Sequence, residues 1–245
     1  MDKLHIDEHI SRQFNEELEE VRSQVLHMGG IVEEQLSNVL KVLSGENVDL
    51  YRAVIDADAQ VNTLEVDIDE ECTRIVVRRQ PAATDLRLVM AVSKTINELE
   101  RIGDEAKRVA KMFRKGLGGM LNEDIRAELL LMGELVREML RKVLDAFART
   151  DVDTAVDVVK ADKKVDKKYK KLIKKLIKLM SSDPEVIPVV INVLWAVRAL
   201  ERLGDRCQNI AEHVIYLVLG MDVRHIKLDD VLAEIDAQLE PDDEE

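Results

Sequence analysis

The chain has 245 residues, of which 46% are hydrophobic, 35% charged and only 3% aromatic, and its formal net charge is −13 at pH 7. So acidic a surface would repel phosphate groups, which argues against a nucleic-acid-binding protein. Two cysteines, Cys72 and Cys207, are too few for a disulfide scaffold and indicate a reducing compartment. No segment approaches the roughly 20 apolar residues of a membrane span. We therefore expect a soluble, cytoplasmic protein.

Helical periodicity runs through the whole chain, and strand patterns are missing. Gly, Pro and capping residues divide the chain into six long helices, expected near residues 6–43, 48–79, 84–116, 122–149, 153–180 and 184–220. The sixth helix is expected to have Ser182 or Asp183 as its N-cap and Pro184 in its first turn. After Met221 we expect a short helix and a frayed acidic end. The short connections require antiparallel neighbours, which predicts an all-α bundle fold.

Much of the sequence occurs twice. The phrase Glu100-Arg-Ile-Gly-Asp104 recurs as Glu201-Arg-Leu-Gly-Asp205, and Met28-Gly29 recurs as Met132-Gly133 within the same local pattern. This repetition predicts two tandem, similar three-helix bundles. We divide the chain into a first bundle, a second bundle and an acidic carboxy-terminal tail, at residues 1–118, 119–221 and 222–245.

Glycines inside the helices indicate where backbones pack closely. Counting residues back from each turn puts Gly103 of the third helix at the height of Gly29 and Gly30 of the first. A glycine within a helix costs about 1 kcal/mol relative to alanine, so close backbone approach is the expected compensation. We expect the first and third helices to meet at these glycines, and we expect the same of Gly133 and Gly204 in the second bundle.

Acidic side chains form stripes on facing helices near the repeated phrase. Carboxylates at positions i and i+4 lie on one face of a helix and repel each other unless a cation neutralises them. The candidate metal ligands of the first bundle are Asp58, Asn62, Glu65, Asp69, Asn97, Glu100 and Asp104. Those of the second bundle are Asp162, Asp166, Glu201, Asp205, Asn209 and Glu212. Oxygen ligands suit Mg²⁺, Ca²⁺, Mn²⁺ or iron, and they suit zinc less without His or Cys.

A solvated face of salt bridges is the main alternative to metal binding. It is favoured by four arginines near the acids: Arg101, Arg198, Arg202 and Arg206. His5 and His9, at i and i+4, form a further candidate metal pair. Di-iron oxygenase chemistry is not expected, because the Glu-x-x-His motif of those bundles is missing. The chain also has no P-loop, nucleophile elbow or Cys-x-x-Cys, so we do not expect an enzyme.

Lysines cover one broad face of the fifth helix. They are Lys163, Lys164, Lys167, Lys168, Lys170, Lys171, Lys174, Lys175 and Lys178. A solvated face is the simplest explanation of this pattern. In so acidic a protein, however, a local basic stripe is also suited to an acidic partner or to anionic lipid headgroups.

Several of these phrases together resemble a known family. Two of them are repeated, namely the Glu-Arg-x-Gly-Asp motif and the Met-Gly pairs at residues 28–29 and 132–133. The others are the turn from Arg79 to Arg87 (Arg-Gln-Pro-Ala-Ala-Thr-Asp-Leu-Arg) and Asp205-Arg-Cys-Gln-Asn209. Over essentially its whole length the chain resembles the PhoU family. The resemblance implies two similar three-helix bundles in a cytoplasmic, often dimeric protein. It also implies metal clusters on the repeated motifs, at Glu100, Asp104, Glu201 and Asp205.

The first bundle departs from the family pattern at two positions. Arg108 and Lys111 stand where the motif is usually extended by Asn and Glu, as it is in the second bundle. A complete metal cluster is therefore expected in the second bundle more than in the first.

The same resemblance implies a regulatory function. Members of the family repress the phosphate-starvation regulon and modulate high-affinity phosphate uptake. They act as adaptors between the ATPase subunit of the phosphate transporter and a membrane sensor histidine kinase, at the cytoplasmic face of the inner membrane. Two other classes of function stay open on the residues alone. One is a metal-binding bundle with a metal-dependent or storage role, and the other is a peripheral membrane scaffold.

Overall fold

The computed structural model describes residues 12–113, 121–224, 226, 230 and 233. Within these ranges it contains six long helices and no strand, which confirms the all-α expectation. The helices are α1 (Arg12–Ser44), α2 (Tyr51–Arg79), α3 (Ala83–Phe113), α4 (Glu123–Arg149), α5 (Val152–Ser182) and α6 (Ile187–Leu219). The expected boundary between residues 118 and 119, the pair His5 and His9, and most of the acidic tail lie outside the described residues.

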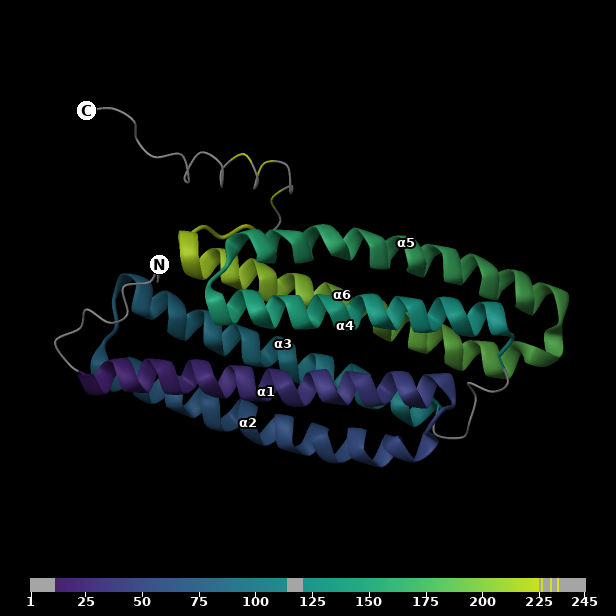
Figure 1. Cartoon of the computed structure of the whole chain (residues 1–245), viewed down its shortest axis with the longest axis horizontal. Coiled ribbons are helices and arrows are strands. Elements are labelled where there is room, and N and C mark those ends of the chain that lie inside the picture. Colours follow the sequence, from purple (N-terminus) through teal and green to yellow (C-terminus); the bar gives the residue numbers. More distant parts are fainter. Residues whose placement is uncertain (1–11, 114–120, 225, 227–229, 231–232, 234–245) are drawn as a thin grey trace.

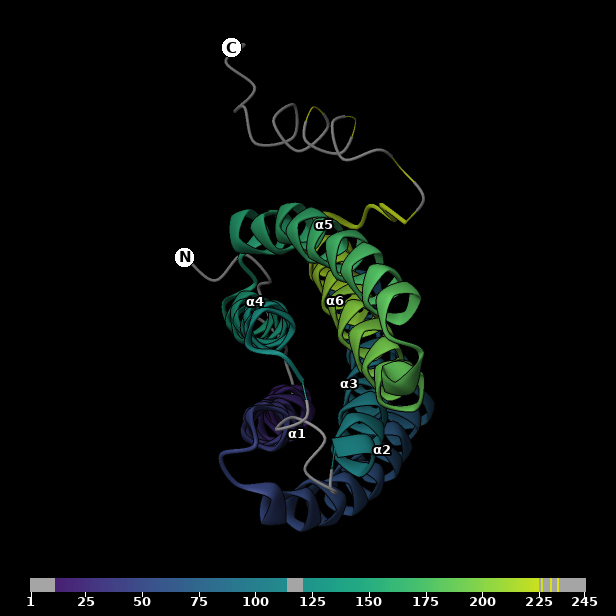
Figure 2. The same ribbon diagram turned by 90° about the vertical axis from the view of Figure 1, so that its right-hand side faces the viewer.

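The helices form two similar groups that pack side by side (Figure 1). The first group is α1, α2 and α3, the second is α4, α5 and α6, and all three helices of each group contact one another. The groups meet where α3 packs against α6 and α1 against α4. Figure 2 shows α5, α6, α3 and α2 as one curved layer, with α1 and α4 packed inside the curve. The tandem three-helix bundles expected from the sequence repeat are therefore confirmed.

The helix ends follow the capping residues of the sequence. Asn122 and Asp151 accept hydrogen bonds from backbone amides in the first turns of α4 and α5, at 2.9 and 3.2 Å. Asp183 accepts one from the amide two residues further on, at 3.1 Å, as expected of an N-cap. Pro184–Val186 then form a 3-10 turn before α6 begins. α6 ends where Gly220 adopts a left-handed conformation, with a φ of 72°.

The helix glycines do not meet one another, so that expectation is wrong. A Cβ on Gly29 would collide with Leu144 of α4, and a Cβ on Gly133 would collide with Leu40 of α1. These two glycines therefore make room for the contact between the bundles. Gly103 instead faces α1 and α2 side chains within its own bundle. Counting from the turns estimates the height of a residue along a helix, but it does not give the direction in which that residue faces.

A buried amide joins the three helices of the first bundle. Gln35 of α1 has no exposed surface, and its Nε2 donates to the carbonyl oxygens of Val54 at 2.9 Å and Gly103 at 3.3 Å. A Cβ on Gly103 would lie 3.1 Å from Oε1 of Gln35, so the glycine leaves space for the amide. Because a buried amide left without partners costs about 1–3 kcal/mol, these bonds hold α2 and α3 at one height against α1.

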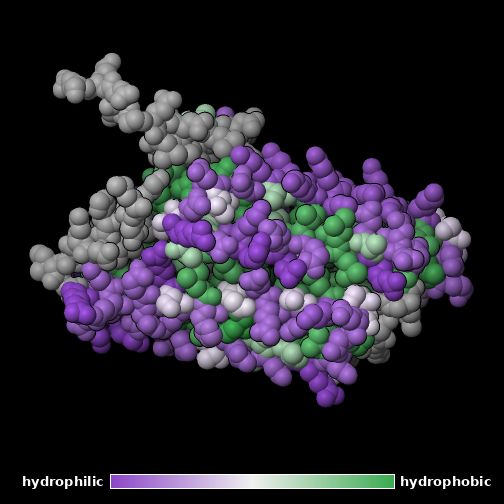
Figure 3. All heavy atoms as spheres, in the orientation of Figure 1, coloured by the Kyte–Doolittle hydropathy of each residue, from purple (hydrophilic) through white to green (hydrophobic). Residues whose placement is uncertain are grey.

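None of the described helices is long and apolar enough to cross a membrane. The apolar side chains that line the inner faces of the helices form one core cluster, which extends through both bundles. Figure 3 shows hydrophilic residues over most of the face formed by α1 and α4, with smaller apolar areas between them. The repeated acidic motifs lie on the other side of the protein, on α3 and α6 of the curved layer (Figure 2).

Candidate functional site

In the first bundle an internal cation lies between the acids. Lys107 of α3 donates to Asp58 of α2 at 2.6 Å and to Asp104 of its own helix at 2.7 Å. The side chain of Asp58 is only 8% exposed, so the ammonium neutralises a charge that water hardly reaches. Burial alone would lower the pKa of Lys107, but these two hydrogen bonds raise it above its ordinary value. Burial, followed by the charge of Asp104, raises the pKa of the neighbouring Glu100.

The other predicted ligands of the first bundle lie further along the same helices. Asn97 donates to Glu65 at 3.4 Å, and Ser93 donates to Asp69 at 2.9 Å. Glu65, Asp69 and Asn97 line a cavity of about 640 Å³, and Asn62 is exposed. The predicted acidic stripe is therefore divided between the ion pair and this cavity, and it does not converge on one point.

Positive and neutral groups also line this cavity, and sequence reasoning did not single them out. Lys94 of α3 lies over the ring of Tyr216, 5.0 Å from the ring centroid. His213 of α6 is buried, and its Nδ1 has no hydrogen-bond partner among the described residues. Burial, followed by the charges of Lys94 and Arg224, lowers the pKa of His213 to about 4. The imidazole is therefore neutral at physiological pH.

The second bundle has a different residue at the position of Lys107. The repeat places Gln208 there, and its amide donates to Glu212 at 2.9 Å instead of bridging two helices. Asp162 of α5 is only 8% exposed, yet among the described residues no ammonium group pairs with it. Burial, followed by the charge of Asp205, raises the pKa of Asp162 to about 7.

Glu201 of α6 lies near the same buried acid. It is 9% exposed and forms an ion pair with Arg198 through one oxygen. Its second oxygen, Oε2, is buried and has no hydrogen-bond partner in the described part of the chain. Burial, followed by the charge of Asp205, raises the pKa of Glu201. A Cβ on Gly204 would lie 2.9 Å from Oδ1 of Asp162, so the motif glycine makes room for that carboxylate between α5 and α6.

The remaining predicted ligands of the second bundle are closer to solvent. Asp205 is exposed, and Asn209 is partly buried. Asp166 lies 3.9 Å from the ammonium of Lys170. The second bundle thus brings Asp162, Glu201, Asp205 and Asp166 into electrostatic contact, but their degrees of exposure differ.

Two motif arginines pair across the bundles. Arg202 of α6 contacts Glu105 of α3 at 2.8 Å, and Arg206 contacts Glu98 at 3.1 Å. Both glutamate side chains are only 11–12% exposed, whereas Arg202 is 42% exposed, so these pairs are partly buried and differ from a fully solvated face of salt bridges. They fasten α3 to α6. Arg101, by contrast, is exposed.

The two bundles differ in how well they fit a metal ion. As the side chains stand, no group of three or more His, Cys, Asp or Glu residues in the described ranges could hold one. The first bundle does not fit, because Lys107 already holds Asp58 and Asp104. In the second bundle, Oε2 of Glu201 has no hydrogen-bond partner although Oε1 pairs with Arg198, and no ammonium group among the described residues pairs with the nearly buried Asp162. A cation there would require side-chain rotation to bring three carboxylates together.

Comparison with known proteins matches this two-bundle architecture. The family model for the PhoU domain matches residues 25–113 and 129–214, once in each bundle. The chain belongs to the PhoU family. It is 46% identical to the phosphate-specific transport system accessory protein PhoU of Escherichia coli, over 97% of this chain and 99% of that protein. It is also 46% identical to the PhoU homolog of Pseudomonas aeruginosa, over 96% of this chain and 98% of that protein.

Solved structures of PhoU proteins have the same fold. The crystal structure of PhoU from Pseudomonas aeruginosa matches with a TM-score of 0.81 and 46% identity, covering 85% of this chain and all of that one. The phosphate transport system regulatory protein PhoU of Streptococcus pneumoniae matches with a TM-score of 0.79 and 30% identity, covering 86% and 99% of the two chains. The family resemblance inferred from the sequence motifs is thus confirmed.

Proposed function

We propose that this protein is a negative regulator of the phosphate-starvation regulon and a modulator of high-affinity phosphate uptake. It works in the cytoplasm, as a homodimer, and links the ATPase subunit of the phosphate transporter to a membrane sensor histidine kinase. These partners recruit it to the cytoplasmic face of the inner membrane. The observation that carries the proposal is the match along nearly the whole chain to proteins named as accessory or regulatory proteins of phosphate transport.

The contact between α3 and α6, which we call the joint between the bundles, supports a function as an adaptor. Six long helices provide two extended surfaces, one on each bundle. The pairs of Arg202 with Glu105 and Arg206 with Glu98 tie these surfaces together. An adaptor transmits a signal only if it binds two states of a partner with different affinity, and a stiff connection between two binding surfaces allows such a difference to be passed on.

A binding experiment tests the adaptor. The full-length chain is immobilised, and the detergent-solubilised kinase and the transporter ATPase subunit are applied with and without phosphate. We expect the affinity for the kinase to change by about tenfold when the transporter is present and phosphate is added, a typical size for allosteric coupling. Unchanged kinase binding, together with intact signalling in a strain that lacks the protein, would overturn the proposal.

A matched pair of variants tests the role of the joint. Arg202→Gln combined with Arg206→Gln removes both ion pairs between α3 and α6. We expect each partner still to bind alone, while the effect of one partner on the other is reduced. Arg101→Gln is the control, because Arg101 is an exposed arginine of the same motif and belongs to neither pair. If the control variant loses coupling to the same extent, the joint does not carry the signal.

A cation site in the second bundle is a second candidate function. We propose that Asp162, Glu201 and Asp205 hold a hard cation such as Mg²⁺, Mn²⁺ or iron, and the buried, unpartnered Oε2 of Glu201 supports this. Metal analysis after purification in metal-free buffer, followed by readdition, tests it. Glu201→Gln should abolish binding, whereas Glu100→Gln should not. If regulation persists in the Glu201→Gln variant, the metal has no part in signalling.

A further inference from the structure

Equivalent helices of the two bundles carry opposite charge. α2 contains seven acidic and four basic residues, a net charge of −3, whereas its counterpart α5 contains four acidic and ten basic residues, a net charge of +6. The whole chain carries −13, so positive charge is concentrated on one helix. The screening length at physiological salt is about 8 Å, so a partner that touches α5 senses the local charge and not the total.

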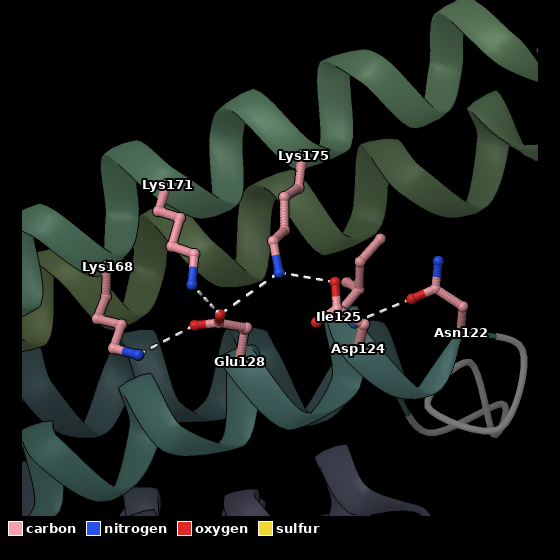
Figure 4. Close-up of polar contacts among 7 residues, drawn as sticks. All are labelled: Asn122, Asp124, Ile125, Glu128, Lys168, Lys171 and Lys175. Atoms are coloured by element: carbon pink, nitrogen blue, oxygen red, sulfur yellow. Dashed lines mark hydrogen bonds and ion pairs between the residues drawn. The ribbon is translucent and has the colours of Figure 1, made fainter.

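Three lysines of α5 are bound to α4. Lys168, Lys171 and Lys175 all contact Glu128, and Lys175 also contacts Asp124 at 2.6 Å (Figure 4). The hydrogen bonds from Lys171 and Lys168 lower the pKa of Glu128 to about 2. These contacts hold α5 against α4, so the three ammonium groups already have counterions within the protein.

A second set of lysines on α5 faces solvent. They recur every three or four residues, which places them on one stripe of the helix: Lys163, Lys167, Lys170, Lys174 and Lys178. All are exposed, and in the described part of the chain only Lys170 has a carboxylate within ion-pair distance, Asp166 at 3.9 Å. Neighbouring unpaired cations repel one another, so this stripe favours an anionic partner outside the chain.

Large apolar side chains are exposed on the same hairpin. Four of them are 36% to 61% exposed: Ile177, Ile187, Ile191 and Trp195. The guanidinium of Arg198 lies over the ring of Tyr169, 5.8 Å from its centroid, which fixes the register of the antiparallel α5 and α6. Ile177 lies eight residues along α5 from Tyr169, and Ile191 lies seven residues back along α6 from Arg198, so the two isoleucines are at nearly the same level. The apolar residues therefore form one patch near the tip of the hairpin, beside the lysine stripe.

The first bundle lacks this combination. The repeat places Val66 where the second bundle has Lys170, and Glu70 where it has Lys174. The other three stripe positions correspond to Ala59, Thr63 and Arg74, so the equivalent stripe of α2 carries no net charge. Exposed apolar residues lie near it as well, such as Val77, which is 72% exposed. An anionic partner would therefore be attracted by the lysine stripe of the second bundle and not by the equivalent stripe of the first.

The chemistry of the patch identifies the partner. Tryptophan and aliphatic side chains beside lysines are typical of surfaces that lie in the headgroup region of a membrane. Lysine can bend its flexible stem and follow mobile headgroups, whereas fixed carboxylates of a protein partner are more often bound by the planar fork of arginine. We propose that the outer face of the α5–α6 hairpin docks on membranes that contain anionic phospholipids, with Trp195 in the headgroup layer.

The tryptophan makes this proposal directly testable. Trp195 is the only tryptophan in the sequence, so its fluorescence reports on this face alone. The full-length chain is mixed with vesicles of phosphatidylglycerol and phosphatidylcholine, or of phosphatidylcholine alone. We expect a blue shift of emission and co-sedimentation only with the anionic vesicles, quenching by brominated lipid, and weaker binding as salt is raised. The vesicles contain no protein, so the result does not depend on the adaptor proposal.

Surface variants decide whether this face is responsible. Lys170→Gln and Lys174→Gln should each weaken vesicle binding by about fivefold, and Ile191→Ser should weaken it at every salt concentration. The control is Val77→Ser, which removes an exposed apolar residue of the first bundle and should leave binding unchanged. Thermal melts verify that all variants fold. The proposal fails if anionic vesicles neither shift nor retain the wild-type protein, or if the control loses as much affinity. It also fails if the lysine variants lose binding only to a transporter or kinase, because the occupant is then an acidic protein surface.

Discussion

Replacing Lys107 with methionine should destabilise the protein by about 2–3 kcal/mol at neutral pH. Lys107 forms two charged hydrogen bonds, at 2.6 and 2.7 Å, and a hydrogen bond to a charged group typically contributes about 1.5–3 kcal/mol. The bond to Asp104 counts for less, because that side chain is 38% exposed and water screens it. The bond to Asp58 counts for more, because its loss leaves a nearly buried carboxylate without a counterion.

Urea denaturation followed by circular dichroism measures this loss. Lys111→Met is the matched control, because Lys111 is an exposed lysine one turn further along α3, and it should change the free energy of unfolding by less than about 0.5 kcal/mol. Asp58→Asn combined with Lys107→Met should recover much of the lost stability, since the unpaired charge is then gone. The reasoning is refuted if Lys107→Met costs no more than the control, or if the effects of the two substitutions at Asp58 and Lys107 simply add.

Three further predictions concern the other charged sites. The pKa of Asp162 is raised to about 7 in the folded protein, so the folded state binds this proton more tightly than the unfolded one and loses stability as pH rises from about 4 to 7. Asp162→Asn should therefore stabilise the protein by about 2–4 kcal/mol at pH 8 and by little at pH 4, as measured by urea titration. Gln208→Lys should supply the missing ammonium and raise the melting temperature at pH 8, while a variant already carrying Asp162→Asn should gain little from it. Glu128, whose pKa is lowered to about 2 first of all by Lys171, stabilises the fold above about pH 4.5 and progressively less toward pH 2. Glu128→Gln should thus cost about 1–2 kcal/mol at pH 7, and this cost should shrink in acid melts.

The fold was predictable because its signals are local and occur twice. Asp183 marks the start of the last helical segment and Gly220 its end, and both act in the structure as their chemistry predicts. The tandem arrangement follows from the repeated motif, since similar sequences of this length form similar bundles. The predicted contact between helix glycines of the same bundle was wrong. Gly29 lies against Leu144 of the other bundle, and rotation about the helix axis, which decides such contacts, is set by packing between distant segments.

The acidic site was only partly predictable, for a different reason. The stripes of carboxylates were visible, but the cation that neutralises one of them was not identified. Lys107 lies three residues after Asp104, and this spacing places it on the same face, so a comparison of the two repeats at Lys107 and Gln208 offered the signal. Nothing in the sequence indicated that His213 would be buried beside the cavity, because its burial depends on how α6 packs in the folded bundle.

The differences between the two bundles favour different binding functions for each of them. In the first bundle Lys107 satisfies the buried acid internally, so that region is complete without a ligand. In the part of the second bundle that the structure describes, no ammonium group pairs with Asp162, and Oε2 of Glu201 has no partner, although its other oxygen pairs with Arg198. Among the described residues, the exposed Lys163, Lys167, Lys174 and Lys178 of α5 have no carboxylate within ion-pair distance. The unpaired carboxylate oxygens and the unpaired lysines both lie in the second bundle. The carboxylates would be neutralised by a cation, and the lysines by an anionic partner. Exchanging the residues at 107 and 208 should therefore move cation binding to the first bundle, while lipid binding should stay with the unchanged lysines of α5.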